Sequence, residues 1–142
     1  MEETRGEAPV DAQAIRRRVF VDEQGVARDD EWDEHDRAGS DTLHFVALAA
    51  GAAVGCARLR AYGADAKVER VAVLPEQRGT GLGRLLMAAV ERAAGRCGHR
   101  EFVLHAQADS IPFYEHLGWR AEGPQFEEAG IAHRKMRKAL VP

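Results

Sequence analysis

Residues 68–87 of this chain read VERVAVLPEQRGTGLGRLLM, and this stretch decides the fold class. It begins with an apolar run typical of a buried strand, and this strand is expected to end at Pro75. A loop of alternating glycines follows. From Leu82 to Cys97, apolar residues then recur at intervals of three and four, which predicts an amphipathic helix. The sequence therefore predicts a strand, a glycine loop and a helix in direct succession.

The glycine loop has the properties of an anion site. Glycine lets the backbone approach a ligand closely and adopts positive φ without steric cost. A helix that begins inside such a loop directs unpaired N–H groups, and the positive end of its dipole, at the bound group. We expect a phosphate or pyrophosphate here. The residues expected to hold it are Arg78, Gly79, Thr80, Gly81, Gly83 and Arg84.

Two familiar phosphate loops do not match this sequence. A dinucleotide fingerprint requires G-x-G-x-x-G, but Arg84 stands three residues after Gly81. A Walker A loop requires Gly-Lys-Ser/Thr at its end, and no such tripeptide follows. What remains is R-x-x-G-x-G directly after a hydrophobic strand. The alternative is a glycine-rich strand-to-helix turn that binds no ligand.

The rest of the chain predicts an α/β mixed sheet flanked by helices, in a single domain over residues 1–142. A first helix is capped by Asp11, and an acidic loop without periodicity follows it. A strand on each side of the central helix makes a βαβ crossover, which places those two strands parallel. A turn at Gly123-Pro124 separates the last two strands. Strands are expected at residues 43–49, 53–60, 67–74, 101–106, 119–121 and 131–138.

Composition narrows the function classes. The 142 residues are 45% hydrophobic and 30% charged, and 20 basic against 23 acidic residues give a net charge of −3. This charge argues against non-specific nucleic-acid binding, and no apolar run approaches the roughly 20 residues of a membrane span. Cys56 and Cys97 lie far apart, as expected of free thiols in the reducing cytoplasm. No metal-ligand spacing occurs, and we expect the acidic run around His35 to be solvated.

A second motif, SIPFYEHLGW, occupies residues 110–119. Its Tyr114 lies 31 residues after Gly83. It predicts a short helix that ends at a glycine. We expect Phe113 and Leu117 to pack inward, because they are four residues apart. Tyr114 would then point toward a cleft between the two parallel strands. The alternative is that Tyr114 is an ordinary core residue.

The two motifs together resemble the GNAT superfamily of N-acetyltransferases. The loop resembles the family's pyrophosphate loop, and SIPFYEHLGW resembles its closing segment. VFVDEQG and EEAGIAHRKM also resemble small bacterial members related to ElaA. Many members carry an asparagine where this chain has Gln107, followed three residues later by a small residue, here Ser110. The resemblance implies the GNAT fold, acetyl-CoA as donor, no metal, and direct transfer to an amine within a ternary complex.

The resemblance also implies roles on the central strand. Backbone N–H groups of Val71 and Val73 would pair with the pantetheine arm and polarise the thioester carbonyl. Glu69 matches the position of a catalytic base and alternates with both valines, so we expect the three side chains to share a face. A useful base would need its pKa raised toward neutrality. Alternatively, Glu69 is simply ion-paired, with Arg58 or Arg60 as partner.

Three further expectations concern the acceptor side. Tyr114 is the candidate acid for the leaving thiolate, since tyrosine keeps its proton at neutral pH. His133 is the alternative base. In the early acidic loop, Glu23, Gln24 and Trp32 are expected to wall the acceptor pocket, where acidic residues would suit a cationic amine.

The sequence leaves several functions open. The first is acetylation of a primary amine on a small-molecule acceptor. The alternatives are acetylation of a protein lysine or N-terminus, and a catalytically silent, CoA-binding regulatory module. The acceptor, the length of the acyl chain and the choice between monomer and homodimer are not determined.

Overall fold

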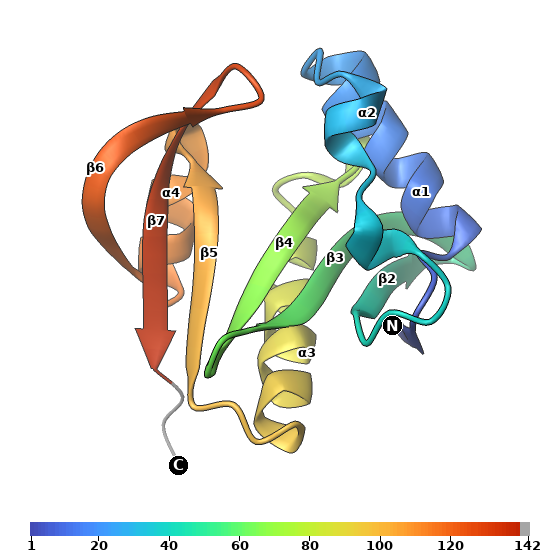
Figure 1. Ribbon diagram of the computed structural model, residues 1–142. Helices are drawn as coiled ribbons and strands as arrows, with labels where there is room; N and C mark the ends of the chain where they lie inside the picture. Colours follow the sequence, from blue (N-terminus) through green and yellow to red (C-terminus); the bar gives the residue numbers. More distant parts are fainter. Residues whose placement is uncertain (140–142) are drawn as a thin grey trace.

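Seven strands form one mixed sheet in the computed structural model, which describes residues 1–139 (Figure 1). The strand order is β1-β2-β3-β4-β5-β7-β6, and β4–β5 is its one parallel pair. The expected mixed sheet and βαβ crossover are therefore confirmed. The elements are β1 (Glu2–Arg5), α1 (Val10–Arg16), η1 (Arg17–Glu23), α2 (Arg28–Glu31), η2 (Glu34–Asp36), β2 (Leu43–Ala49), β3 (Ala52–Tyr62), β4 (Asp65–Val73), η3 (Pro75–Gln77), α3 (Leu82–Arg96), β5 (Glu101–Gln107), η4 (Ala108–Ser110), α4 (Ile111–His116), β6 (Arg120–Glu128) and β7 (Ile131–Ala139).

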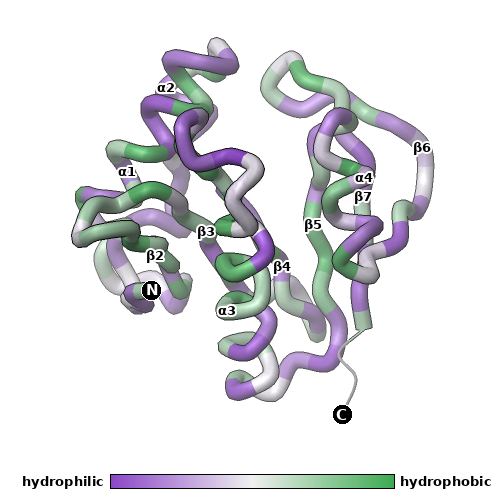
Figure 2. Tube along the Cα trace, turned by 180° about the vertical axis from the view of Figure 1, so that it is seen from behind, coloured by the Kyte–Doolittle hydropathy of each residue, from purple (hydrophilic) through white to green (hydrophobic). Residues whose placement is uncertain are grey.

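The two faces of the sheet carry separate hydrophobic cores. Helix α3 packs its apolar stripe, which includes Leu86 and Val90, on one face, and Figure 2 shows this helix from outside. Helix α1 packs Ile15 on the other face, against a smaller cluster that includes Val46. Burying one such side chain is worth about 1.5–3 kcal/mol. Within residues 1–139, no helix combines the length and the apolar composition that a membrane crossing requires.

The sheet opens between its two parallel strands. Strands β4 and β5 are paired only over Ala66↔Phe102, Lys67↔Val103 and Val68↔Leu104. Beyond this point the strands diverge, as Figure 1 shows. Arg70 has a φ of 54°, and the β3–β4 register shifts beside it, so β4 carries a bulge there. Because a bulge bends its strand and increases the local twist, it favours this divergence.

The N-terminal region differs from the prediction in two respects. Helix α1 begins at Val10, with Pro9 rather than Asp11 at the N-cap, and helical structure continues as a π-helix to Glu23. A strand forms at Glu2–Arg5 although its residues are weak strand formers, because its backbone pairs with the edge of β2. Both differences come from tertiary contacts that override local propensity.

The last hairpin turns at a different place from the one predicted. Ala129 and Gly130, with φ of 52° and 77°, form the turn between β6 and β7. Gly123-Pro124 lies instead inside β6, where the register with β7 shifts between Glu122 and Phe126. A proline is tolerated there because β6 is an edge strand and the shift leaves the ladder interrupted.

Candidate active site

A cleft of about 920 Å³ fills the opening between β4 and β5. Its walls come from segments far apart in the sequence: η1, α2, β4, the glycine loop, β5, α4 and the β6–β7 hairpin. Most of the residues that the sequence singled out line this one cleft. They are Glu69, Val71, Val73, Arg78, Gly79, Gly81, Gly83, Arg84, Gln107, Ser110, Tyr114 and His133.

The glycine loop forms a cradle of unpaired amides at one end of the cleft. Gly79 and Gly81 have φ of 79° and 86°, and Gly81 is the N-cap of α3. The first amides of α3 point out of the helix without intrahelical acceptors. A Cβ on Gly83 would lie 3.1 Å from Cζ of Phe113, so this glycine allows α4 to approach α3. Thr80 stabilises the loop, with its hydroxyl donating to the carbonyl of Gln77 at 2.6 Å.

The two arginines of the loop differ in their surroundings. Arg78 donates to both carboxylate oxygens of Glu23, at 2.7 and 2.8 Å, and its Nε donates to the Val73 carbonyl at 3.1 Å. This arginine therefore ties the cradle to η1. Arg84 is exposed and forms no ion pair with any residue in the described range 1–139. Of the two, Arg84 is the better placed to meet an incoming phosphate.

The bulge at Arg70 changes which side chains share a face of β4. The register pairs Glu69 with Arg58, and that pair lies on the same face as Ala72, in the α1-side core. Val71 packs instead against the core of α3. The expectation that Glu69 shares a face with Val71 is therefore wrong, because the inserted residue reverses the alternation.

The backbone of β4 presents free donors to the cleft. The N–H of Leu74 donates to the Val54 carbonyl of β3 at 2.9 Å. Since successive amides of a strand point to opposite edges, those of Val73 and Val71 are directed toward the unpaired edge. This arrangement fits the amide partners expected for an extended, amide-rich ligand.

Glu69 is a tightly held carboxylate. Its oxygens accept hydrogen bonds from Arg58 at 2.9 Å and Arg60 at 2.6 Å, and Lys67 Nζ lies 3.3 Å away. Burial favours a higher pKa, but the bond to Arg60 and the charges of Arg58 and Lys67 outweigh it and lower the pKa to about 2. The raised pKa that a useful base would need is therefore not found for Glu69. The alternative, an ion-paired Glu69, is confirmed.

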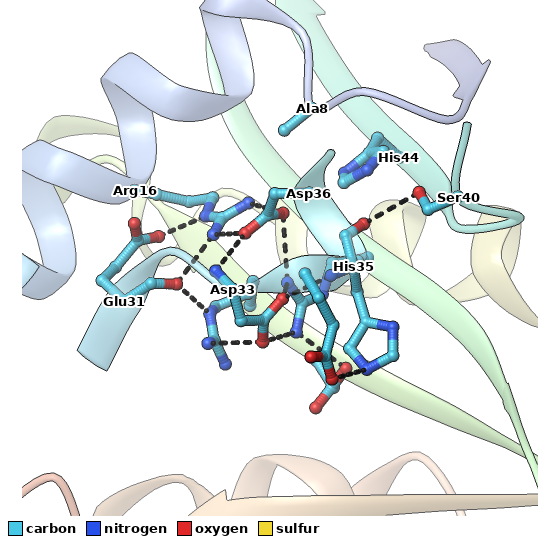
Figure 3. A network of polar contacts seen from close by, with 12 residues as sticks. Ala8, Arg16, Glu31, Asp33, His35, Asp36, Ser40 and His44 are labelled. Carbon is cyan, nitrogen blue, oxygen red and sulfur yellow. Dashed lines mark hydrogen bonds and ion pairs between the residues drawn. The ribbon is translucent and has the colours of Figure 1, made fainter. Parts of the chain in front are cut away.

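Part of the early acidic loop is buried rather than solvated, and Figure 3 shows its polar contacts. Asp36 is 0% exposed; it accepts from Arg16 at 2.6 and 2.8 Å and lies 3.0 Å from Arg58. Asp33 accepts from Arg58 at 2.7 and 2.9 Å and caps η2 in a capping box with Asp36. Sequence reasoning missed this network. The spacing of Asp33 and Asp36, typical of a capping box, was the available signal.

A second polar group lies on the β5–β7 wall. His133 is buried, and its Nδ1 lies 2.7 Å from the carbonyl of Ile131, to which it donates. This bond leaves Nε2 with its lone pair. Nε2 lies 3.8 Å from Glu128, which also contacts His105 Nδ1 at 3.2 Å. The hydrogen bond from His105, together with the charge of both histidines, lowers the pKa of Glu128.

Tyr114 occupies the position expected of it. It is buried, lines the cleft, and packs edge-on against Trp119 with ring centroids 6.1 Å apart. Burial raises its pKa, so it stays protonated at neutral pH. Phe113 is 38% exposed and covers Gly83 at the rim, so the expectation that it packs inward is wrong.

The early loop reaches across the cleft. Gln24 and Gln107 donate to each other's side-chain oxygens, at 3.3 and 2.7 Å, although 83 residues separate them. Gln24 belongs to the segment expected to wall the acceptor pocket, and Gln107 ends β5. Of the three loop residues expected to wall the cleft, Gln24 lines it, whereas Glu23 is bound to Arg78 and neither Glu23 nor Trp32 is part of the lining. Within the described residues, no three metal-ligating side chains converge on a site.

An amide cradle at one end of an opened sheet, with ionisable side chains on the walls beyond it, is typical of group-transfer enzymes that use a phosphate-bearing cosubstrate. Residues 8–140 match the family model described as the acetyltransferase (GNAT) domain. The chain belongs to the GNAT acetyltransferase family, whose members use acetyl-CoA. It is an acetyl-CoA-dependent acetyltransferase.

Relatives and solved structures agree with this family. A Bacillus subtilis (strain 168) protein named as an acetyltransferase is 40% identical over 124 residues, which cover 87% of this chain and 84% of the relative. An N-acetyltransferase structure from Lactobacillus plantarum superposes with a TM-score of 0.86 at 27% identity, covering 99% and 98% of the two chains. Escherichia coli ElaA superposes with a TM-score of 0.81 at 24% identity, covering 96% and 98%. The resemblance to ElaA is thus confirmed at the level of the fold.

Replacing Gly81 by valine is expected to weaken CoA binding about tenfold or more, because several charge-assisted hydrogen bonds depend on the loop conformation. Gly39 provides a matched control, since it has a φ of 88° with open space around its Cα, as Gly81 has. Valine at either position imposes similar backbone strain. Calorimetric titration with CoA would compare the two. Equal CoA affinity in Gly81→Val and the wild type would contradict the cradle.

Proposed function

We propose that this protein transfers the acetyl group of acetyl-CoA directly to the primary amine of a small molecule within a ternary complex. The observation that carries this proposal is the single cleft that joins the amide cradle to Tyr114 and His133. Donor and acceptor can meet there without a covalent enzyme intermediate. The buried Cys56, whose pKa burial raises to about 12, does not line this cleft and is not a nucleophile for it.

The proposed donor site follows the backbone. The amides of residues 79–84 hold the pyrophosphate, and Arg84 supplies a positive charge. The N–H groups of Val71 and Val73 pair with the pantetheine arm, which extends the open edge of β4 as an added strand would. An amide at this edge also stabilises the negative charge that develops on the thioester oxygen during attack.

Two proton transfers complete the proposed reaction. The amine nitrogen bonds to the thioester carbon, the carbon–sulfur bond breaks, and the amine loses a proton. We assign His133 Nε2 as its acceptor, because Nδ1 is held by Ile131 and Glu128 would stabilise the imidazolium. Glu69 is unsuited to this step, since a carboxylate of pKa about 2 is a very weak base. Tyr114 supplies the proton to the leaving thiolate.

The whole chain would act as one catalytic domain. We place the reaction in the cytoplasm, where acetyl-CoA is available and thiols stay reduced, in keeping with Cys56 and Cys97 as free cysteines. A homodimer is compatible with this proposal but is not required by it, because all the proposed site residues come from one chain.

A thiol-release assay with acetyl-CoA tests this function. We expect turnover with at least one class of small primary amine, and none when the amine is replaced by the matching alcohol. A parallel panel of lysine and N-terminal peptides addresses the alternative acceptors. Transfer to peptides alone would contradict a small-molecule acceptor. CoA binding without transfer to any amine or peptide would favour a silent regulatory module.

A further inference from the structure

Nine charged side chains form a connected network behind the α2 end of the cleft. Each belongs to at least one ion pair. In seven of these pairs the nitrogen and oxygen atoms lie 2.6–3.4 Å apart. Arg16 and Glu31 form a further close pair. The five cations outnumber the four anions by one. The members are Arg16, Arg58, Arg60, Lys67 and Arg70, with Glu31, Asp33, Asp36 and Glu69.

Of the five cations, Arg70 has the longest ion-pair contact. Its one carboxylate contact is Asp33, at 3.4 Å, and Asp33 already accepts two shorter hydrogen bonds from Arg58. Burial and the neighbouring charges of Arg58 and Arg16 lower the pKa of Arg70, as expected of a cation with too little compensation. Lys67 and Arg60, in contrast, share Glu69 and the face of the Tyr62 ring.

Hydrogen bonds hold the guanidinium of Arg70 through two of its three nitrogens. Its Nε donates to the Glu31 carbonyl at 3.0 Å, and Nη2 donates to the Asp30 carbonyl at 3.4 Å. Nη1 makes no hydrogen bond within residues 1–139, and the side chain is 21% exposed where it lines the cleft. A guanidinium that is held rigidly and partly desolvated binds carboxylate or phosphate oxygens well.

These contacts change the expectation for the acceptor. Glu31 and Asp33 line the cleft, but both are paired with arginines. The acidic loop therefore does not present unpaired carboxylates from these positions to a cationic ligand. Glu128, on the opposite wall, is hydrogen-bonded to His105. Asp30 also lines the cleft and forms no ion pair within residues 1–139, so the α2 end presents one carboxylate beside the guanidinium of Arg70.

We propose that the amine acceptor carries an anionic group, a carboxylate or a phosphate, which binds Nη1 of Arg70. This inference rests on the proposed function and narrows its substrate class to amino acids or amino-phosphates. The anion would neutralise the network's excess charge and fix one end of the acceptor. The amine would then extend along the cleft toward the acetyl group.

Matched acceptor pairs test this proposal. Glycine, glutamate and lysine are each compared with their carboxamides, and phosphoethanolamine with ethanolamine. Transfer is followed by thiol release, and affinity by calorimetric titration into the CoA complex. We expect the anionic member of at least one pair to be favoured about tenfold or more in KM or Kd. The pair that shows this preference distinguishes carboxylate from phosphate.

Two variants locate the anion site. Arg70→Gln keeps a non-glycine residue at the bulge and should reduce the preference to about twofold or less, because glutamine lacks the charge. Arg60→Gln removes a cation from the same network but outside the cleft lining, and it should retain the preference. CoA affinity and urea unfolding of both variants confirm that they are folded.

The outcomes separate this proposal from the proposed function. Equal transfer to both members of every pair would leave the acetyltransferase function intact and overturn the anion site. A preference that survives in Arg70→Gln would overturn it as well. Arg70-dependent binding of anionic amines without transfer would support the site and contradict the function. The absence of both binding and transfer with every anionic probe would overturn the anion site.

Discussion

Replacing Asp36 by asparagine is expected to lower the free energy of unfolding by about 3–5 kcal/mol, the usual cost of breaking a buried ion pair by removing one partner. Asp36 has no exposed surface and contacts both Arg16 and Arg58. Asparagine has nearly the same shape but leaves both buried guanidinium groups with less charge compensation. Urea unfolding measured at neutral pH would give the difference.

A surface ion pair provides the control. Arg18 and Glu76 form two hydrogen bonds of 2.8 Å, but their side chains are 52% and 49% exposed. Glu76→Gln should therefore leave the free energy of unfolding nearly unchanged, because water solvates both partners and screens their attraction. A loss in Asp36→Asn as small as in this control would contradict a structural role for the buried network.

The effect of Asp36 also depends on pH in a definite direction. Burial favours a higher pKa, but the hydrogen bond from Arg16 and the charges of both arginines outweigh it and hold the pKa below its ordinary 3.8. The stabilisation is therefore complete above the unfolded-state pKa and is lost as the pH falls through the folded-state value. The difference between wild type and Asp36→Asn should shrink as the pH is lowered below about 4.

Replacing His133 by asparagine is expected to lower kcat about 10²–10⁴-fold, the usual contribution of a general base. The amide nitrogen of asparagine can take the place of Nδ1 and keep the hydrogen bond to the Ile131 carbonyl, while the acceptor at Nε2 is lost. The substitution therefore tests the proton acceptor with little change to the wall of the cleft. Steady-state kinetics at saturating acetyl-CoA and amine would measure it.

The pH dependence of kcat distinguishes His133 from Glu69. Histidine side chains generally titrate between about pH 5.5 and 7.5, so a histidine base gives an acid limb in that range. That limb should disappear in His133→Asn. A base with the pKa of about 2 found for Glu69 would leave kcat flat over the same range. Persistence of the acid limb in the variant would assign the proton to another group.

His105 offers a matched histidine. It lines the same cleft, but its Nδ1 contacts Glu128 at 3.2 Å, whereas Nε2 of His133 lies 3.8 Å from that carboxylate. We expect His105→Asn to keep kcat within a few-fold of the wild type. A loss as large as in His133→Asn would show that the effect arises from Glu128 or the hairpin rather than from one base.

Much of the fold and of the candidate site was predictable from the sequence. The strand at 43–49 and the central helix agree with the structure to within a residue at each end, because their apolar periodicity is strong and local. The alternating glycines predicted the cradle, since positive φ and close approach restrict those positions to glycine. The hairpin turn was misplaced, because Gly123-Pro124 reads as a turn from local preference alone.

The burial and pairing of the charged side chains around the cleft could not be predicted in the same way. Nothing local distinguishes Arg16 from its neighbours Arg17 and Arg18, yet it alone of the three is buried. The pKa of Glu69 depends on Arg58 and Arg60, which reach it only through the register of β3 with β4. The face on which Glu69 lies was reversed by one bulged residue, Arg70.

The sequence by itself therefore determined the strand–loop–helix unit, the mixed sheet and the glycine loop at the start of the central helix. These features follow from backbone geometry and from apolar periods that act over a few residues. The tertiary structure alone decided which carboxylates are paired with arginines, which side chains line the cleft and which nitrogen of Arg70 is left without a partner among the described residues. Electrostatic interactions depend on distance and burial in three dimensions, and residues far apart in the chain supply the partners.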